Sequence, residues 1–162
     1  MLKYLYTKQV FSEIPEEITL GISISGCQIH CQGCHSRDLW EDKGTDLTYE
    51  NVEKLIFNNE GVTCILFLGG ERDPHYLAEL FMQTKLHFPK LKIAWYCGLD
   101  LLPCDDEYFI LSFLDYLKLG HYDEELGGLA SKTTNQRLFK IGHENKVNRL
   151  EDITYKFWKN DN

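Results

Sequence analysis

The sequence predicts an α/β protein with a largely parallel sheet. Predicted strands alternate with predicted helices, and some of the strands are continuous apolar runs, as buried parallel strands are. The polar motifs lie just after predicted strands, where ligands gather in parallel α/β proteins. A full eight-unit barrel usually takes about 250 residues, and this chain has 162. We therefore expect an open or partial parallel β/α barrel.

The first predicted elements lead from a strand through a helix to a second strand. Residues 18–25 alternate apolar and polar side chains and include β-branched residues, which favours a strand. Thr48 is a suitable N-cap for a helix over 49–58, with Val52, Leu55 and Ile56 on one face. The apolar run 62–68 predicts a buried strand that ends at Gly69.

The second half continues the alternation. Asp73 followed by Pro74 predicts the start of a helix that runs to about residue 88. Residues 92–97 predict a strand ended by Gly98, and 107–114 a short helix. Residues 115–119 predict a short strand ended by Gly120, and 137–141 a last strand.

Composition and charge exclude several classes of protein. The formal net charge of −8 disfavours a broad nucleic-acid interface. No apolar run approaches the roughly 20 residues of a membrane span. The first residues lack the apolar region of a secretory signal, so we expect a cytoplasmic protein with reduced thiols.

Three of the six cysteines lie within one short loop, Cys27-x3-Cys31-x2-Cys34. A structural zinc site is one interpretation, with His30 or His35 as the fourth ligand that zinc requires. A disulfide plus one free thiol is a second, disfavoured by the expected compartment. The third is an iron–sulfur cluster: four cysteines usually hold four irons, so three leave one iron open to a small molecule.

A second motif, Gly69-Gly70-Glu71, follows the strand over 62–68. It is either a plain turn with a solvated carboxylate or part of a ligand site, since glycines permit close backbone approach.

The cysteine spacing resembles the signature of radical S-adenosylmethionine (SAM) enzymes, which also carry a Gly-Gly-Glu at this place. The chain is more specifically similar to the activating proteins of anaerobic ribonucleoside-triphosphate reductase, over about residues 15–142. The segments that carry this similarity are 26–36, Trp40, 95–98, 115–122 and 134–137.

The resemblance implies a single radical SAM domain over 1–162, with its core at about 15–142, a C-terminal tail at 143–162 and a partial barrel of the radical SAM type. It implies that three cysteines ligate a [4Fe-4S] cluster: Cys27, Cys31 and Cys34. Gly69, Gly70 and Glu71 would bind the methionine end of SAM, whose ammonium needs acceptors. His35 or nearby backbone would contribute to adenine binding.

The implied reaction is reductive cleavage of SAM to a 5′-deoxyadenosyl radical, which installs a glycyl radical on the large reductase subunit. A flavodoxin or ferredoxin would supply the electron. Neither nucleic acid nor membrane is expected as a partner. The alternatives are a radical SAM enzyme with another substrate, a non-catalytic zinc module, and a family member that has lost activity.

Some residues depart from the family or have no assigned role. Gly33 stands where radical SAM loops often have an aromatic residue, and Cys97 where threonine is common. Residues 11–17 replace the glycine-rich segment of many members. We expect Cys64 in the core and Cys104 in a loop.

Three further interpretations concern polar residues outside the two motifs. Asp115 and Lys118 are interpreted as a solvated strand edge, and His121 as a surface histidine. The resemblance suggests that Asn135, Gln136 and Arg137 lie at the rim of the radical site or at the partner interface.

Overall fold

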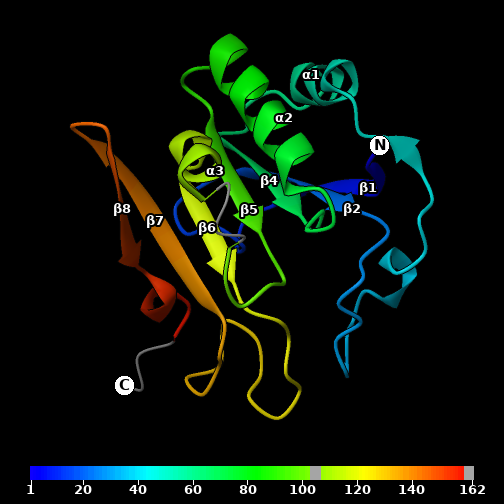
Figure 1. The fold of residues 1–162 in the computed structure, drawn as a ribbon, viewed down its shortest axis with the longest axis vertical. Helices are drawn as coiled ribbons and strands as arrows, with labels where there is room; N and C mark the ends of the chain where they lie inside the picture. Colours follow the sequence, from blue (N-terminus) through cyan, green and yellow to red (C-terminus); the bar gives the residue numbers. More distant parts are fainter. Residues whose placement is uncertain (103–106, 159–162) are drawn as a thin grey trace.

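The protein is a mixed α/β fold built on one open eight-stranded sheet (Figure 1). The computed structural model describes residues 1–102 and 107–158. The strands are β1 (Lys3–Val10), β2 (Thr19–Ile24), β3 (Thr45–Asp46), β4 (Cys64–Leu68), β5 (Lys92–Tyr96), β6 (Tyr116–Leu119), β7 (Arg137–Glu144) and β8 (Val147–Asp152). The helices are α1 (Tyr49–Phe57), α2 (Pro74–His87) and α3 (Glu107–Phe113), with 3-10 turns η1 (Arg37–Leu39) and η2 (Thr154–Phe157).

The order of strands across the sheet is β3-β1-β2-β4-β5-β6-β7-β8. The four central strands β2, β4, β5 and β6 are parallel to one another. Antiparallel strands extend the sheet on both sides, β1 and β3 beyond β2, and β7 and β8 beyond β6. The sheet is therefore mixed. That it forms a partial barrel of the radical SAM type stays a prediction.

The predicted helix starts are present. The Thr48 side chain accepts a hydrogen bond from the Asn51 N–H, so it caps α1, and Asp73 accepts one from the Tyr76 N–H at the start of α2. Pro74 opens α2, where its missing N–H costs nothing.

The predicted strand over 137–141 is present as the first part of β7, but it is not the last strand. β7 continues to Glu144 and turns at Asn145 and Lys146, both with positive φ, into β8. Residues 143–152, predicted as part of a C-terminal tail, thus complete a hairpin within the sheet. β1 and β3 were also not predicted, because β1 buries none of its side chains fully.

Each face of the sheet packs against its own apolar cluster. The larger cluster joins the helices to the sheet and includes Val52, Phe67, Leu77, Trp95 and Ile110. The smaller cluster lies on the other face, where the segments around Ile14 and Ile153 cover the strands. Cys64 belongs to this second cluster, so its predicted core position is confirmed, whereas Cys104 lies outside the described residues.

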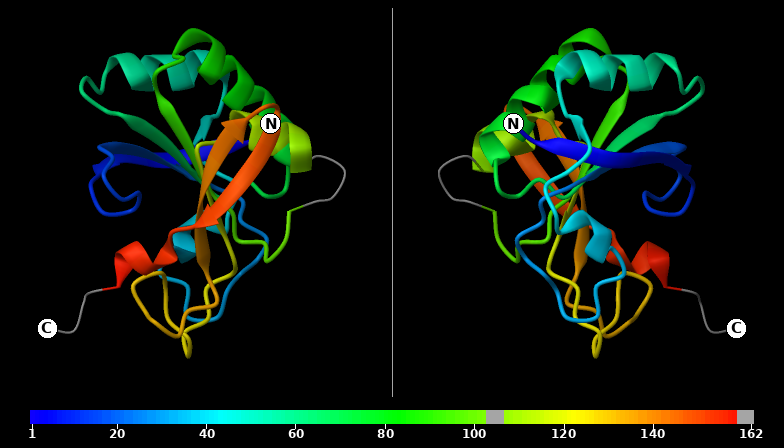
Figure 2. Two further views of the ribbon diagram at one scale, coloured as in Figure 1. Left: turned by 90° about the vertical axis from the view of Figure 1, so that its left-hand side faces the viewer. Right: turned by 90° about the vertical axis from the view of Figure 1, so that its right-hand side faces the viewer.

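The long connections after β2 and after β6 lie at one end of the sheet, away from α1 and α2 (Figures 1 and 2). These connections carry the cysteine loop and residues 120–136. Both loops therefore gather at the carboxyl ends of β2 and β6.

Candidate functional site

The cysteine loop starts directly after β2 and is closed by backbone hydrogen bonds. The chain turns at Gly26, where φ is +77°. The N–H of Gly26 donates to the carbonyl of Glu41 (3.2 Å), and that of Cys27 to the carbonyl of Leu39 (3.0 Å). These bonds tie both ends of the loop to each other, so the loop projects from a fixed base.

All three loop cysteines are free thiols with half-buried side chains. Burial raises the pKa of the Cys27 thiol, while the backbone N–H groups of Ile29 and His30 favour its thiolate and act in the opposite direction. The N–H of Cys34 donates to the carbonyl of Cys31 (3.2 Å). Within the described residues, no three His, Cys, Asp or Glu side chains converge on one point as ligands of a metal ion.

The tip of the loop packs against residues 121–125. Gly33 has φ of +74°, and a Cβ there would lie 2.4 Å from a carboxylate oxygen of Glu124. The Gln32 amide donates to the same carboxylate (2.9 Å). The positive φ and this close contact both favour glycine at position 33. His35 is exposed and its ring contacts Tyr122 at 5.5 Å, so its role toward adenine stays a prediction.

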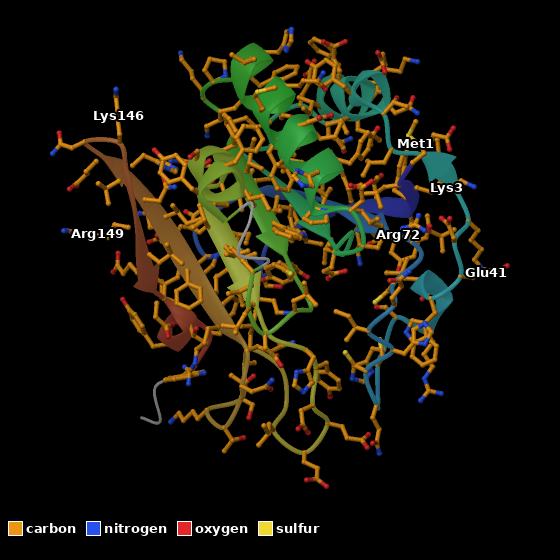
Figure 3. The ribbon with its side chains drawn as sticks, in the orientation of Figure 1. Met1, Lys3, Glu41, Arg72, Lys146 and Arg149 are labelled. Atoms are coloured by element: carbon orange, nitrogen blue, oxygen red, sulfur yellow. The ribbon has the colours of Figure 1, made fainter. Side chains whose placement is uncertain are left out.

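Arg72 connects the cysteine loop to the turn after β4. Its guanidinium donates two hydrogen bonds to the Asp42 carboxylate, at 2.9 and 3.1 Å, and one to the Met1 carbonyl. It also covers Gly26, where a Cβ would lie 3.0 Å from its Cζ. Figure 3 shows Arg72 on the same side of the molecule as Met1 and Glu41. The contact positions the turn that carries Glu71 against the base of the loop.

One side chain from each parallel strand forms a row across the sheet. The row consists of Ser23, Leu68, Tyr96 and Lys118, which are partners in register from β2 to β6. All four line a cavity of about 220 Å³, together with Cys27, Cys34, Trp40, Gly69, Glu71 and Gly98. The structure therefore brings two of the three predicted cluster ligands and part of the Gly-Gly-Glu motif to one cavity.

The Gly-Gly-Glu turn places the Glu71 carboxylate in this cavity. Its Oε1 accepts a hydrogen bond of 2.6 Å from the Gly98 N–H, at the end of β5. Gly69 and Gly70 have φ of +91° and +89°, which disfavours other residues there. The Gly69 carbonyl accepts from the Trp95 indole (2.9 Å), so this backbone is already bound within the fold.

The interpretation of Lys118 as a solvated strand edge is wrong. Lys118 is 7% exposed and lies in the interior of the sheet, between β5 and β7. Asp115 is not solvated either, because its carboxylate pairs with Lys85 (2.6 Å) and accepts from the Ile93 N–H (2.9 Å). Asp115 therefore connects β5, β6 and α2 and does not line the cavity.

Residues 135–137 lie beside a second hollow of about 400 Å³. The Asn135 amide donates to the His121 carbonyl (3.1 Å), and the Gln136 amide to the Gly120 carbonyl (3.3 Å). These bonds hold residues 120–121 in place. The His121 ring is partly exposed, as predicted, and pairs with Asp100 at 2.8 Å.

A larger hollow, about 570 Å³, lies at the opposite end of the strands. Residues 56–63 and 88–91 line it, before β4 and β5. It contains none of the predicted site residues, so its size does not make it the functional site.

Taken together, the site combines three free thiols, a half-buried acid and a buried base at the carboxyl ends of parallel strands, and these thiols are suitable ligands of a metallocofactor. Residues 18–141 match the family described as the 4Fe-4S single cluster domain, and this chain belongs to that family. No curated protein and no solved structure matches the chain. The prediction of an iron–sulfur protein is thus confirmed at the level of the cluster type.

The described residues also fit such a cluster chemically. The three free thiols lie on one short loop, and cysteine thiolates are the usual ligands of iron–sulfur clusters. No helix among the described residues has the length and apolar character needed to cross a membrane.

Proposed function

We propose that this protein is a radical SAM enzyme that activates an anaerobic ribonucleoside-triphosphate reductase by installing a glycyl radical on its large subunit. The observation that carries this proposal is the shared cavity of Cys27, Cys34 and Glu71 at the carboxyl ends of parallel strands. Membership of the 4Fe-4S single cluster family supports the cofactor. The sequence motifs described above support the reaction and the partner.

Cys27, Cys31 and Cys34 would hold three irons of the cluster, and the fourth iron would remain open to SAM. When bound and reduced, the cluster supplies the electron that cleaves SAM to methionine and a 5′-deoxyadenosyl radical. The loop orients the three thiolates through its backbone bonds at Gly26 and Cys27. Glu71 binds the ammonium of the methionine moiety, and its bond to Gly98 keeps the carboxylate facing the cavity.

The substrate side of the proposal is a protein loop that carries the target glycine. The cavity opens at the end of the sheet where the long connections lie, and not inside a closed barrel. Such an opening lets a polypeptide approach the reactive position, while Tyr122 and Glu124 contact the cysteine loop on one side.

The test is anaerobic reconstitution followed by iron and sulfide analysis and electron paramagnetic resonance with and without SAM. We expect about four irons and four sulfides per chain, a spectrum that changes when SAM is added, and methionine release on reduction. Incubation with the large subunit of an anaerobic reductase should then yield a glycyl radical signal.

Single alanine variants of the three loop cysteines should lose SAM cleavage. Cys64→Ala is the matched control, because this thiol is buried at the start of β4, away from the cavity. Cleavage retained in all three loop variants contradicts the ligand assignment, and one zinc in place of iron contradicts the cofactor. Cleavage without a glycyl radical indicates a different substrate.

A further inference from the structure

β8 is an exposed edge strand whose outer backbone groups are unpaired. It is the outermost strand on its side of the sheet (Figure 1), and β7 pairs with its inner side. The Ile153 N–H donates to the Leu138 carbonyl (2.8 Å), which fixes the alternation along this pair of strands. The odd-numbered residues of β8 therefore bond to β7, and the N–H and C=O groups of Asn148, Leu150 and Asp152 point outward. Within the described residues, no backbone group pairs with them.

This edge lacks the features that usually keep an edge strand from pairing with another chain. β8 has six residues, contains no proline and pairs with β7 without a bulge. The opposite edge of the sheet is protected by its shortness, because β3 has only two residues. Apolar side chains also border the β8 edge, since Val147 is 64% exposed and Leu150 38%. Tyr108, 65% exposed, lies beside the start of β8, where its hydroxyl donates to the Lys146 carbonyl (3.1 Å). A regular edge of this kind is a template for another strand.

The charged side chains along β8 are arranged symmetrically about Leu150. Arg149 and Glu151 flank it, and both are exposed. Their side chains lie on one face of the sheet and that of Leu150 on the other. Figure 3 shows Arg149 at the outer edge of the sheet, directed away from the molecule. Neither charged side chain has an ion-pair partner within residues 1–102 and 107–158.

Two β8 strands can pair antiparallel in only a few registers. Outward residues must oppose outward residues, because only their backbone groups are free. A register centred on Arg149 or on Glu151 places like charges directly opposite each other, which is destabilising. Registers centred nearer the ends of the strand overlap over fewer residues. The register centred on Leu150 opposes Arg149 of each copy to Glu151 of the other, and it brings the two Leu150 side chains together on the other face.

We propose that β8 is an interface between two copies of this chain, which pair antiparallel about a twofold axis at Leu150. The pairing joins the two sheets edge to edge and satisfies the outward backbone groups with about six hydrogen bonds. β8 lines no part of the candidate cofactor cavity, so this inference stands independently of the proposed function. Because a short pair of strands is a small interface, we expect a dissociation constant of about 1–100 μM.

The test measures the molar mass of the whole, anaerobically reconstituted chain by sedimentation equilibrium from about 1 to 500 μM. Wild-type protein should change from monomer to dimer across this range. Amide hydrogen exchange gives a second readout, because dimer formation should protect the N–H groups of Asn148, Leu150 and Asp152. The N–H groups of Arg149 and Glu151 bond to β7, so their protection should not depend on protein concentration.

Charge reversal distinguishes this interface from any other. Arg149→Glu and Glu151→Arg each place like charges opposite each other at two symmetry-related positions, so each should weaken dimerisation about 10- to 100-fold. A mixture of the two variants restores both pairs of opposite charges and should form a heterodimer within about threefold of wild-type affinity. The double variant Arg149→Glu/Glu151→Arg should also dimerise like wild type. Lys90→Glu, at an exposed position before β5, is the control for charge reversal and should match wild type.

Three outcomes overturn the inference. It is wrong if wild-type protein remains monomeric up to about 500 μM. It is also wrong if both single variants dimerise as well as wild type, because the interface would then lie elsewhere. The third outcome is a mixture of the two variants that associates no better than either variant alone. Misfolding would not explain that result in variants that keep the wild-type midpoint of urea unfolding at low concentration.

Discussion

Replacing Gly70 by alanine should destabilise the protein more than the same change at Gly69, although the two positions are adjacent and have similar φ. Both substitutions force a Cβ into a left-handed conformation, which costs about 1–3 kcal/mol. At Gly69 the nearest group to that Cβ is the Ile24 carbonyl oxygen at 3.3 Å. At Gly70 the new Cβ lies 2.8 Å from Leu77 Cδ1 and 3.0 Å from Ile24 Cδ1.

The contacts at Gly70 belong to the buried cluster between the sheet and the helices, where Leu77 and Ile24 are almost fully inaccessible. Overpacking such a core costs a further about 1–3 kcal/mol. We therefore expect losses of about 1–3 kcal/mol for Gly69→Ala and about 2–6 kcal/mol for Gly70→Ala. For a chain of this size each kcal/mol lowers Tm by about 2–4 °C.

The assay is urea unfolding of the cluster-free, reduced protein, followed by tryptophan fluorescence. Wild-type protein and Gly61→Ala serve as references, since Gly61 also has positive φ (+84°) but its Cβ would meet no atom within 4 Å. A Gly70→Ala variant no less stable than Gly61→Ala would refute the reasoning. So would a larger loss at Gly69 than at Gly70.

Three other predictions concern ion pairing, thiol reactivity and the loop tip. Asp115→Asn should lower the free energy of unfolding in urea by about 1–3 kcal/mol, because it weakens the half-buried bonds of this carboxylate to α2 and to the Ile93 N–H of β5. Glu41→Gln, which removes an exposed ion pair, is the control and should cost less than about 0.5 kcal/mol. Equal losses in the two variants would contradict this prediction. Burial raises the pKa of Cys97 to about 12, so at pH 8 only about one thiol in 10⁴ is ionised. In the folded, cluster-free protein, iodoacetamide should then modify the loop cysteines far faster than Cys97 or Cys64, as peptide mass mapping would show; comparable rates would be evidence against this burial. Gly33→Ala should lower the amount of iron that the protein binds on reconstitution, because the new Cβ displaces the Glu124 carboxylate from the loop tip. Full iron loading of this variant would show that the loop tip adapts freely.

The positions of the motifs could be predicted from the sequence, because local chemistry determines them. The apolar run before Gly69 and the alternation before Gly26 place both motifs at strand ends, where the structure has them. The caps at Thr48 and Asp73 were also predictable, since in each a side-chain oxygen accepts from a backbone N–H only three residues further along the chain.

The outer strands could not be predicted, because their formation depends on pairing and not on their side chains. β8 exposes most of its residues, so its sequence carries no apolar alternation. It exists because its backbone pairs with β7 over six register positions. Such pairing is formed by backbone groups that every sequence shares.

Lys118 and Asp115 show best what only the tertiary structure decided. They are three residues apart, and in a strand that spacing directs their side chains to opposite faces. The sequence alone determined that the two faces differ, and that three thiols and a Gly-Gly-Glu turn follow parallel strands. Which face meets α2 and which completes the cofactor cavity depends on strand order and register, because these bring Ser23, Leu68, Tyr96 and Lys118 into one row from four separate segments of the chain.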